Sequence, residues 1–544
     1  MLISALLGSA LAAPPTQVHL ALGKTPDTMA VAWATADAAD SEVQWGQGTL
    51  TASSPGDSRP FTQDPNRTWY THTAIITGLQ PDTAYSYRVG GSGEFSPVYN
   101  FTSPRTKAPF RHVIYGDMGA ASAFSLCSAC TSSSPVCDAA ACAGNTTAGL
   151  VGEVGKADII VHMGDFAYDL GDEGGTLGDQ FMTNIEQVAA RVPYMVSHGN
   201  HEDADIHLAH FIERFRHQPS NAVPPLFNTT NGETTNTLYF SWDYGLVHYV
   251  SISTEMWFGV TDGKTTLQTM LSWLEKDLEA ANQNREAAPW IIVQGHRSVY
   301  CSCDSDCTGD AGKVRTDLEP LLFKYGVDIF MNGHEHNYER SFPLYQGKSD
   351  RSTVNPKATI YSVSGAAGSR EMHEPFTRKQ PSWSAFRSNT FGYTALTVYN
   401  ATHLHWQQIS TDPTSFPLAN YGAVIDDAWI VQESHGPFSL EEAPKGEAYP
   451  EGGDEPVRQI DHWQPLLGLG GDGQRIEDSV ADFRDQHGDA AWVEKLCMLQ
   501  DWAEVNLGGP MTWKGRSSVE WEDVREDGSS DGAAFEWQSP ATLV

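Results

Sequence analysis

The feature that most constrains this chain is a short apolar run that stops at a glycine and is followed at once by polar side chains. Residues 159–161 (Ile-Ile-Val) form the run, and Gly164 opens the hexapeptide GDFAYD. An apolar run stopped by glycine predicts a buried strand that opens into a loop. Asp165 has the two oxygens needed to bridge two cations, and Tyr168 is close enough in sequence to reach one of them as a phenolate. The same residues also fit an aspartate in a turn beside a packed tyrosine. Other segments of the chain are needed to decide between a metal site and such a turn.

The same arrangement recurs at the ends of four other predicted strands, each followed by oxygen or nitrogen donors near a glycine. Glycine at these points lets the backbone turn sharply and lets a cation approach without a Cβ in the way. Loops at the ends of parallel strands are where catalytic groups gather. Five such strand ends therefore predict one shared site. The donors are Asp117 after 113–115, Asp165 and Tyr168 after 159–161, Asn200 and His201 after 194–196, His296 after 290–293, and His334 and His336 after 327–331.

The donor types indicate metal ions, because carboxylate, phenolate, amide and imidazole groups are present and no thiolate is required. A tyrosine phenolate suits a hard trivalent ion such as Fe(III), whereas asparagine with histidine suits a divalent ion. Two cations about 3.5–4 Å apart would clamp a phosphate ester and activate water for in-line attack. The net charge of -34 argues against nucleic acid or an anionic membrane as a partner, so a phosphate site needs such local positive charge.

The chain is long enough for two or three domains, with 544 residues of globular composition. Residues 14–105 contain alternating or apolar runs separated by Gly, Pro and Asp, which predicts a β-sandwich. Within it, residues 78–85 (GLQPDTAY) resemble the tyrosine corner of fibronectin type III domains. Residues 106–438 alternate strands with helical patterns at 267–283 and 314–325, which predicts an α/β domain with parallel strands. Residues 439–544 are rich in acidic residues and glycine, and we expect this C-terminal extension to be partly disordered.

Several features predict a secreted protein. Residues 1–13 are apolar, and Ala10-Leu11-Ala12 fits an A-x-A cleavage site, so they are read as a signal peptide although they lack a basic n-region. No other run approaches the roughly 18 apolar residues of a membrane span. Delivery outside the cell or to a vacuole or lysosome is left open. Five sequons predict N-linked glycans, at Asn66, Asn100, Asn145, Asn228 and Asn400.

Eight cysteines agree with an oxidising compartment, where disulfides are favoured over a zinc site. They fall into two clusters and one isolated residue, Cys497, which is a candidate partner for the odd member of the second cluster. The clusters are Cys127, Cys130, Cys137 and Cys142, and then Cys301, Cys303 and Cys307.

The motifs, taken in order, resemble those of the purple acid phosphatase family: DxG, GDxxY, GNH followed by Asp or Glu, a histidine block and GHxH. The wider metallophosphoesterases have DxH at the first block, and Tyr168 would take the place of the histidine that is missing here. The resemblance spans about residues 15–438 and implies a fibronectin-like domain followed by an αββα metallophosphoesterase sandwich. The blocks here are Asp117-Met118-Gly119, residues 164–168, residues 199–202, His296 and residues 333–336.

The resemblance implies a role for each matching residue. His201 would hold the phosphate and protonate the leaving group, next to a centre in which Asp165 bridges two metals. The implied reaction is hydrolysis of small phosphate monoesters by a metal-activated hydroxide, at acidic pH because Fe(III) keeps water deprotonated there. Fe(III) would be bound by Asp117, Asp165, Tyr168 and His336, and the divalent ion (Zn, Mn or Fe) by Asp165, Asn200, His296 and His334.

Three points stay open. A phosphodiesterase or phytase could use the same centre, whereas a catalytically silent metal- or glycan-binding protein would not need all seven ligands.

Some plant-type members carry further imidazoles about ten residues past the fourth block, where this chain has cysteines at 301–307, so Arg297 and His373 are candidates to assist His201. His162 and His198 lie near the motifs, but strand alternation can turn them away from the metals.

Overall fold

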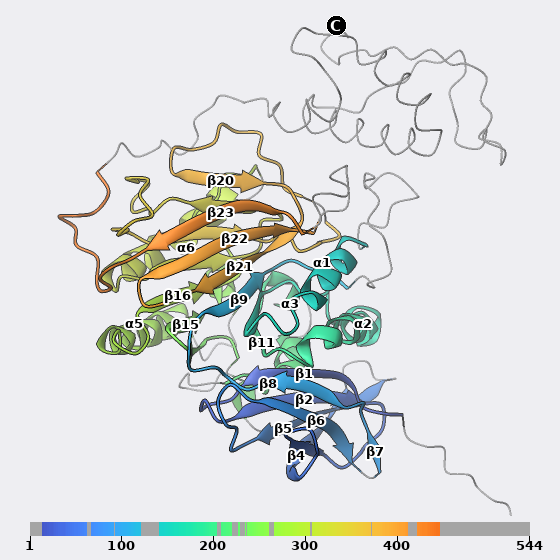
Figure 1. Ribbon diagram of the computed structural model, residues 1–544. Helices are drawn as coiled ribbons and strands as arrows, with labels where there is room; N and C mark the ends of the chain where they lie inside the picture. Colours follow the sequence, from blue (N-terminus) through green and yellow to red (C-terminus); the bar gives the residue numbers. More distant parts are fainter. Residues whose placement is uncertain are drawn as a thin grey trace, which may run out of the picture.

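The structure is a computed structural model of the chain (Figure 1). No helix within its described residues is both long and apolar enough to cross a bilayer. The signal peptide prediction, the first cysteine cluster except Cys142, Cys497 and nearly all of the acidic extension lie outside these residues. The described residues are 13–62, 67–91, 93–120, 141–203, 208–219, 227–228, 234–235, 237–260, 266–304, 307–371, 373–411 and 422–445.

The N-terminal part is all β, and its strands pair antiparallel in the order β1-β2-β5-β4-β3-β6-β7, with β8 on β6. The long β4 pairs with β3 at its start and β5 at its end, so it joins the two layers of a sandwich. The tyrosine corner predicted from residues 78–85 is present, because the backbone N–H of Gln80 donates to Tyr85 Oη at 3.0 Å. The strands are β1 (Thr16–Leu22), β2 (Met29–Thr35), β3 (Glu42–Gly46), β4 (Ala52–Thr62), β5 (Thr68–Ile76), β6 (Ala84–Gly91), β7 (Glu94–Phe95) and β8 (Tyr99–Thr102).

The second part contains two mixed sheets. One has the order β11-β10-β9-β21-β22-β23, and the other has the order β14-β15-β16-β17-β19-β18-β20. Strands β9, β10 and β11 are parallel in the first sheet, and β15, β16, β17 and β19 are parallel in the second. The first sheet comprises β9 (Phe110–Tyr115), β10 (Ile159–Met163), β11 (Tyr194–Ser197), β21 (Gly392–Val398), β22 (His403–Ser410) and β23 (Val424–Val431). The second comprises β14 (Phe240–Tyr244), β15 (Val247–Ser251), β16 (Trp290–Gln294), β17 (Ile329–Asn332), β18 (Tyr338–Ser341), β19 (Ile360–Ser364) and β20 (Ser384–Ser388).

The helices lie on the outer faces of these sheets, with α1 and α2 on one side and α5 on the other (Figure 1). Thr266 caps α5, because its Oγ1 accepts a hydrogen bond from the backbone N–H of Thr269. The predicted helices at 267–283 and 314–325 are confirmed, although the second begins earlier. The helices are α1 (Ala141–Val151), α2 (Asp172–Ala189), α3 (Asn200–Asp203), α4 (Ala209–Arg214), η2 (Thr254–Phe258), α5 (Leu267–Gln283) and α6 (Cys307–Lys324), and a small hairpin pairs β12 (Phe227–Asn228) with β13 (Thr234–Thr235).

Alternation along β10 explains why the sheets form two packed layers. Ile159 and Val161 belong to the buried cluster that also contains Ile292 and Met331 of the other sheet. Ile160 belongs instead to the cluster that includes side chains of α2 and α5. Because both faces of such a strand are buried, it reads as a continuous apolar run. The αββα sandwich expected from the resemblance is therefore confirmed.

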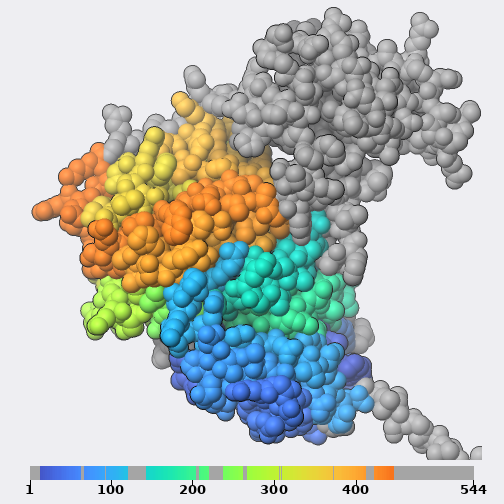
Figure 2. All heavy atoms as spheres, in the orientation of Figure 1, coloured from blue at the N-terminus to red at the C-terminus, as the bar shows by residue number. Residues whose placement is uncertain are grey.

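The N-terminal sandwich packs directly against the second part, as the adjoining blue and teal surfaces in Figure 2 show. Glu186 of α2 accepts a hydrogen bond from the backbone N–H of Gln17 at 2.7 Å and another from Tyr99 Oη. Tyr87 Oη donates to the carbonyl oxygen of Ala190 at 2.8 Å. Strands β1, β6 and β8 are thus joined to the C-terminal part of α2 by hydrogen bonds.

His248 predicts a pH-dependent contribution to stability. It bridges Asp243 and Asp277 at 2.7 and 3.0 Å, which joins the β14–β15 hairpin to α5. Burial lowers the pKa of His248, but these carboxylates outweigh burial and raise it to about 9. The folded-state pKa exceeds the ordinary value, so the stabilisation is complete below about pH 6.5 and is lost as pH rises through about 9.

We expect His248→Gln to lower the free energy of unfolding by on the order of 2 kcal/mol at pH 6 and by much less at pH 10. Thermal unfolding at the two pH values measures the difference. Lys357→Gln, which removes an exposed ion pair with Glu442, is the control and should change stability by less than about 0.5 kcal/mol. Equal losses at both pH values for the histidine variant would contradict the role of its charge.

Candidate metal centre

Five loops meet at one edge of the paired sheets, and each follows the carboxyl end of a parallel strand. Three of the strands, β9, β10 and β11, belong to the first sheet, and two, β16 and β17, belong to the second. The predicted donors are therefore contributed by both layers of the sandwich. The loops carry Asp117, then Asp165 and Tyr168, then Asn200 and His201, then His296, and finally His334 and His336.

Two groups of potential metal ligands share one carboxylate. Asp165, His296 and His334 form one group, and Asp117, Asp165 and His336 form the other. Within each group the ligand atoms lie within 4.8 Å of one another. Asp165 is the common member, which is the geometry that a bridging ligand between two ions requires.

Asn200 and a backbone carbonyl complete the surroundings of His296. His296 Nε2 lies 3.3 Å from Asp165 Oδ2 and 3.0 Å from Asn200 Oδ1. Its Nδ1 donates to the carbonyl oxygen of Met163 at 2.8 Å. This second hydrogen bond fixes the ring orientation and directs Nε2 at the site, as is common for metal-binding histidines.

Tyr168 belongs to the second group. Its Oη lies 2.9 Å from His336 Nε2 and 3.3 Å from Asp117 Oδ1. Asp117, Asp165 and Tyr168 all adopt positive φ angles, of 61°, 54° and 52°. Backbone strain of this kind in non-glycine residues is concentrated at functional sites.

Buried charge dominates the electrostatics of the site. Burial and the neighbouring Asp165 raise the pKa of Asp117 well above its usual value. Burial and the Asp117 and Asp165 carboxylates likewise raise the pKa of the Tyr168 phenol. Burial also acts to raise the pKa of Asp165, but His296 and the other imidazoles bring it below its ordinary value. A cation at this position would replace the protons on Asp117 and Tyr168.

Two glycines keep the centre open. A Cβ on Gly199 would collide with Asp165 Oδ1 and lie 2.7 Å from His296 Nε2. A Cβ on Gly333 would collide with Asp117 Oδ2. The glycines that precede the ligands are therefore required for close approach of the loops to the carboxylates, in addition to the turns predicted from the sequence.

We expect Gly199→Ala to weaken metal binding by about 10- to 100-fold, because the new methyl group displaces Asp165 and His296. Metal content after dialysis against increasing chelator concentrations measures the effect. Gly309→Ala is the matched control, since a Cβ on that exposed residue of α6 meets no atom within 4 Å. Unchanged metal affinity in the Gly199 variant would contradict the tight approach.

His201 lies at the more open side of the centre. Its Nδ1 donates to Asp169 Oδ1 at 2.6 Å, and its Nε2 lies 3.9 Å from Asp165 Oδ2 and 3.6 Å from Glu371 Oε1. Burial lowers the pKa of His201, but the hydrogen bond to Asp169 and the surrounding carboxylates raise it to about 9. The imidazole is therefore protonated at acidic and neutral pH and presents an N–H beside the metal ligands.

Arg297 and His373, the candidates to assist His201, contact metal-ligand candidates. Arg297 Nη1 donates to His334 Nε2 at 3.0 Å, while the guanidinium is held by Glu255 at 2.9 Å and by Asp310. His373 Nδ1 donates to the carbonyl oxygen of His336 at 2.8 Å. Both residues thus support the loop that carries His334 and His336, whereas the His201 ring nitrogens face the carboxylates of Asp169, Asp165 and Glu371.

Glu202 supports the candidate site through hydrogen bonds to the backbone, a role that the sequence did not indicate. Its carboxylate accepts hydrogen bonds from the backbone N–H groups of Asp165 and Gly199 at 2.8 Å and of Phe166 at 3.0 Å. It therefore ties the loop after β10 to the loop after β11. Burial and the Asp165 charge raise the pKa of Glu202 to about 8. In the sequence, Glu202 could be recognised only as the acidic residue at the end of the motif in residues 199–202.

His162 and His198 point into other surroundings. His162 Nδ1 is 2.6 Å from Tyr194 Oη, and its ring packs against Tyr115 and Phe166. His198 Nε2 is 2.8 Å from Ser253 Oγ. Burial lowers the pKa of both rings, to about 4 for His198. Strand alternation accounts for the direction of His162, which lies within β10.

The two groups fit two different cations. Carboxylates with the Tyr168 phenol and one imidazole form a hard, acidic donor set suited to a trivalent ion. One carboxylate with the Asn200 amide and two imidazoles suits a divalent ion. The donor chemistry of the described residues is therefore compatible with a mixed pair of metals that share Asp165.

Comparison with known proteins agrees with this geometry. Residues 15–103 match the purple acid phosphatase N-terminal domain, residues 143–338 the calcineurin-like phosphoesterase family, and residues 358–426 the iron/zinc purple acid phosphatase-like C-terminal region. The chain is 36% identical over 450 residues to acid phosphatase type 7 of Danio rerio, covering 78% of this chain and 92% of the relative. It is 34% identical over 445 residues to acid phosphatase type 7 of Homo sapiens, covering 78% and 92%.

A solved structure has the same architecture. The purple acid phosphatase PPD1 isolated from yellow lupin (Lupinus luteus) seeds superposes with a TM-score of 0.63 at 26% identity, covering 80% of this chain and 78% of that one. The motifs, the sandwich fold, the shared carboxylate and these relatives agree. The chain belongs to the purple acid phosphatase family.

Proposed function

We propose that this protein is a secreted acid phosphatase that hydrolyses phosphate monoesters at a dinuclear centre of Fe(III) and a divalent metal. The observation that carries the proposal is the sharing of Asp165 by two ligand groups whose donors differ in hardness. The family relationship supports the same reaction class.

Seven residues would bind the metals, and His201 with Asp169 would deliver a proton. Asp117, Asp165, Tyr168 and His336 would hold Fe(III), and Asp165, Asn200, His296 and His334 would hold the divalent ion. When bound, the pair of metals supplies Lewis acidity that neutralises the phosphate and activates water for attack. His201 binds a phosphate oxygen through Nε2–H and gives that proton to the leaving-group oxygen. Asp169 accepts the Nδ1–H and so keeps the ring charged and correctly turned.

Secretion is supported by the apolar N-terminal segment, by the Cys301–Cys307 disulfide and by the sequons. The side chains of Asn100 and Asn400 are exposed, as a glycan requires, whereas Asn145 is half-buried in α1. Expression from a eukaryotic host should deliver the protein to the medium without its first residues. Treatment with an N-glycosidase should lower its mass.

One purified sample tests the enzymatic proposal. Metal analysis should find two ions per chain, including iron, and the visible spectrum should contain a tyrosinate-to-Fe(III) absorption from Tyr168. The value of kcat/KM should be higher for a phosphate monoester than for a diester or phytate. A sample with both metals and no visible band would remove Tyr168 from the metal shell, and a preference for diester or phytate would replace the substrate class.

A further inference from the structure

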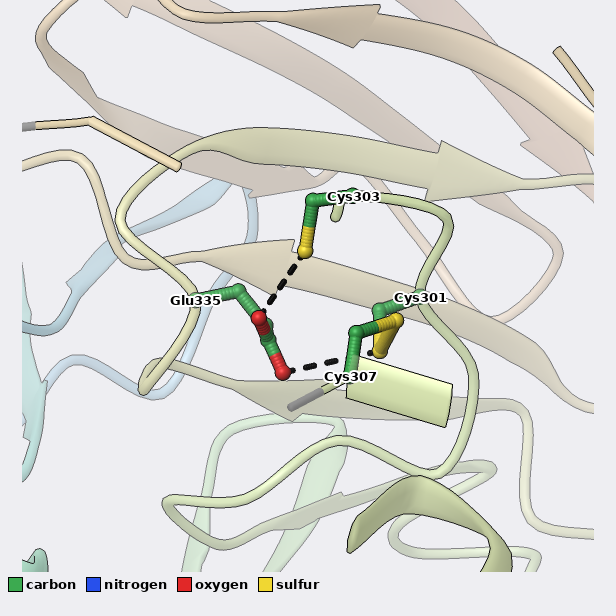
Figure 3. Close-up of side chains that lie close together, drawn as sticks. All are labelled: Cys301, Cys303, Cys307 and Glu335. Carbon is green, nitrogen blue, oxygen red and sulfur yellow. Dashed lines mark hydrogen bonds between the residues drawn. A yellow bond between two sulfur atoms is a disulfide. The ribbon is translucent and has the colours of Figure 1, made fainter. Parts of the chain in front are cut away.

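A third group of potential metal ligands lies next to the proposed dinuclear centre. It consists of Cys301, Cys303, Cys307 and Glu335, whose ligand atoms all lie within 4.8 Å of one another. Figure 3 shows the three sulfur atoms and the Glu335 carboxylate turned toward one another. Cys303, Cys307 and Glu335 are almost completely buried. We refer to these four residues as the sulfur cluster.

The sulfur cluster is assembled from three places in the fold. Cys301 and Cys303 lie in the loop after β16, and Cys307 is the first residue of α6. Glu335 follows β17 and stands between His334 and His336 in sequence. The cluster and the phosphatase centre therefore share two loops, because the loop after β16 also carries His296 and the loop after β17 carries His334 and His336.

In the structure the cluster is oxidised. Cys301 and Cys307 form a disulfide, and the unpaired thiol of Cys303 donates to Glu335 Oε2 at 2.9 Å. The sulfur of Cys301 lies 3.5 Å from Glu335 Oε1. Because a disulfide sulfur has no proton, this approach is a contact between the sulfur and the carboxylate.

The spacing fits a tetrahedral ion. In a zinc site with Zn–S bonds of about 2.3 Å and Zn–O bonds of about 2.1 Å, neighbouring ligand atoms lie roughly 3.6–3.8 Å apart. The cluster atoms, all within 4.8 Å of one another, are already near that spacing, and reduction of the disulfide lets the two bonded sulfurs separate to it. We propose that, when the Cys301–Cys307 disulfide is reduced, Cys301, Cys303, Cys307 and Glu335 bind one Zn²⁺ or a similar soft divalent ion.

A dithiol can reduce the Cys301–Cys307 disulfide before the metal binds. The dithiol gives two electrons and two protons to the Cys301–Cys307 bond, becomes a disulfide itself, and leaves two cysteine thiols. One Zn²⁺ then displaces one proton from each of the three thiols and accepts one oxygen of Glu335. The proposal thus describes two alternative states of one cluster, a disulfide beside a thiol under oxidising conditions and a metal thiolate under reducing conditions.

The surroundings of the sulfur cluster are acidic. Glu374 Oε2 lies 3.9 Å from the Cys303 sulfur, and Glu339 accepts hydrogen bonds from the adjacent Ser302. Burial and the Glu335 and Glu374 carboxylates raise the pKa of the Cys303 thiol well above its usual value. Because Zn²⁺ brings two positive charges and releases three thiol protons, binding makes the cluster more negative by one charge, so the Zn–S and Zn–O bonds must outweigh the repulsion from these carboxylates.

Cobalt provides a direct test on the full-length protein. The reduced protein, kept without oxygen and titrated with Co(II), should develop the near-ultraviolet sulfur-to-cobalt charge-transfer absorption, and the oxidised protein should not. The phosphatase centre has no sulfur ligand, so its cobalt does not produce this band. Addition of Zn²⁺ should remove the band, and reduction should raise the zinc content by one ion per chain.

Variants separate this cluster from the other cysteines of the chain. Replacing Cys301, Cys303 and Cys307 together by serine gives the background from the remaining five cysteines, and the wild-type band must exceed it. Cys303→Ser, which keeps the disulfide pair, should weaken the band by roughly a third, because one of three sulfur ligands is lost. Glu335→Gln should weaken cobalt affinity while leaving the sulfur band visible. A wild-type band equal to that of the triple variant, or unchanged in Cys303→Ser, would overturn the proposal.

Discussion

Replacing Asp165 with asparagine is expected to lower kcat/KM for a phosphate monoester by at least about a thousandfold and to deplete both metals from the protein. Asp165 is the only described residue common to both ligand groups. The amide keeps the size of the carboxylate but removes its charge and one of its two acceptor oxygens. Because two adjacent cations repel each other, loss of the bridging charge weakens both sites and removes several kcal/mol of transition-state stabilisation.

Metal content and steady-state rates of the same preparation measure this effect. Asp172→Asn is a suitable control, since that carboxylate lies nearby in sequence, is about half exposed and contacts Arg370 at 3.8 Å. The control should retain both metals and nearly full activity. An Asp165 variant that keeps two metals and hydrolyses the monoester within tenfold of the wild-type rate would exclude a bridging role.

Replacing His201 with alanine is expected to lower kcat by about 10²- to 10⁴-fold while both metals and the visible band are retained. His201 has no place in either ligand group, and its Nε2 lies 3.9 Å from Asp165. Loss of the imidazole therefore removes the proton donor and leaves the cations. The loss should be greater for alkyl phosphates than for aryl phosphates, because a poor leaving group depends more on protonation.

The pH profile supplies a second readout for His201. Burial lowers the pKa of His201, but the hydrogen bond to Asp169 raises it above the ordinary histidine value, so the proton on Nε2 is present at acidic pH and is lost as pH rises above about 6.5. The rate component that depends on His201 should disappear over the same range and be absent from the variant. His403→Ala, on the distant strand β22, is the control. A rate loss that is equal for all leaving groups would indicate phosphate binding without proton transfer.

The positions of the metal-ligand candidates followed from the sequence because strand ends are simple to recognise. A run such as 159–161, a glycine and a donor give both the strand and the edge at which its loop emerges. Parallel strands place those loops together without further information. The sequence could not show that the five strands divide between two sheets, because pairing depends on contacts between distant segments.

Contacts made by neighbouring polar groups were not predictable in the same way. Asp169 precedes α2 and looks like an ordinary loop aspartate, yet it orients His201. Glu371 approaches His201 from a loop about 170 positions later. No spacing rule joins such residues, since the approach depends on how the loop after β19 returns over the centre.

Some strands and helix ends could not be predicted, because hydrophobic periodicity does not reveal them. Strand β4 contains Pro, Gly and many exposed polar residues, and its partners β3 and β5 define it. Helix α6 begins at Cys307, several residues before its apolar stripe, where the disulfide to Cys301 holds the first turn. In α5 the buried positions are Met270, Leu274, Leu278 and Ala281, whereas Leu271 is half-buried at the border of the stripe.

The interface between α2 and the N-terminal sandwich has a consequence for catalysis. The loop that carries Asp165 and Tyr168 runs directly into α2, and the far end of that helix is fastened by Glu186 to Gln17 and Tyr99. The first domain thus helps to hold the helix that follows the loop carrying the metal-ligand candidates Asp165 and Tyr168. Heating or truncation that breaks these contacts would release metal before the phosphoesterase fold itself unfolds. Enzyme inactivation would then precede global unfolding.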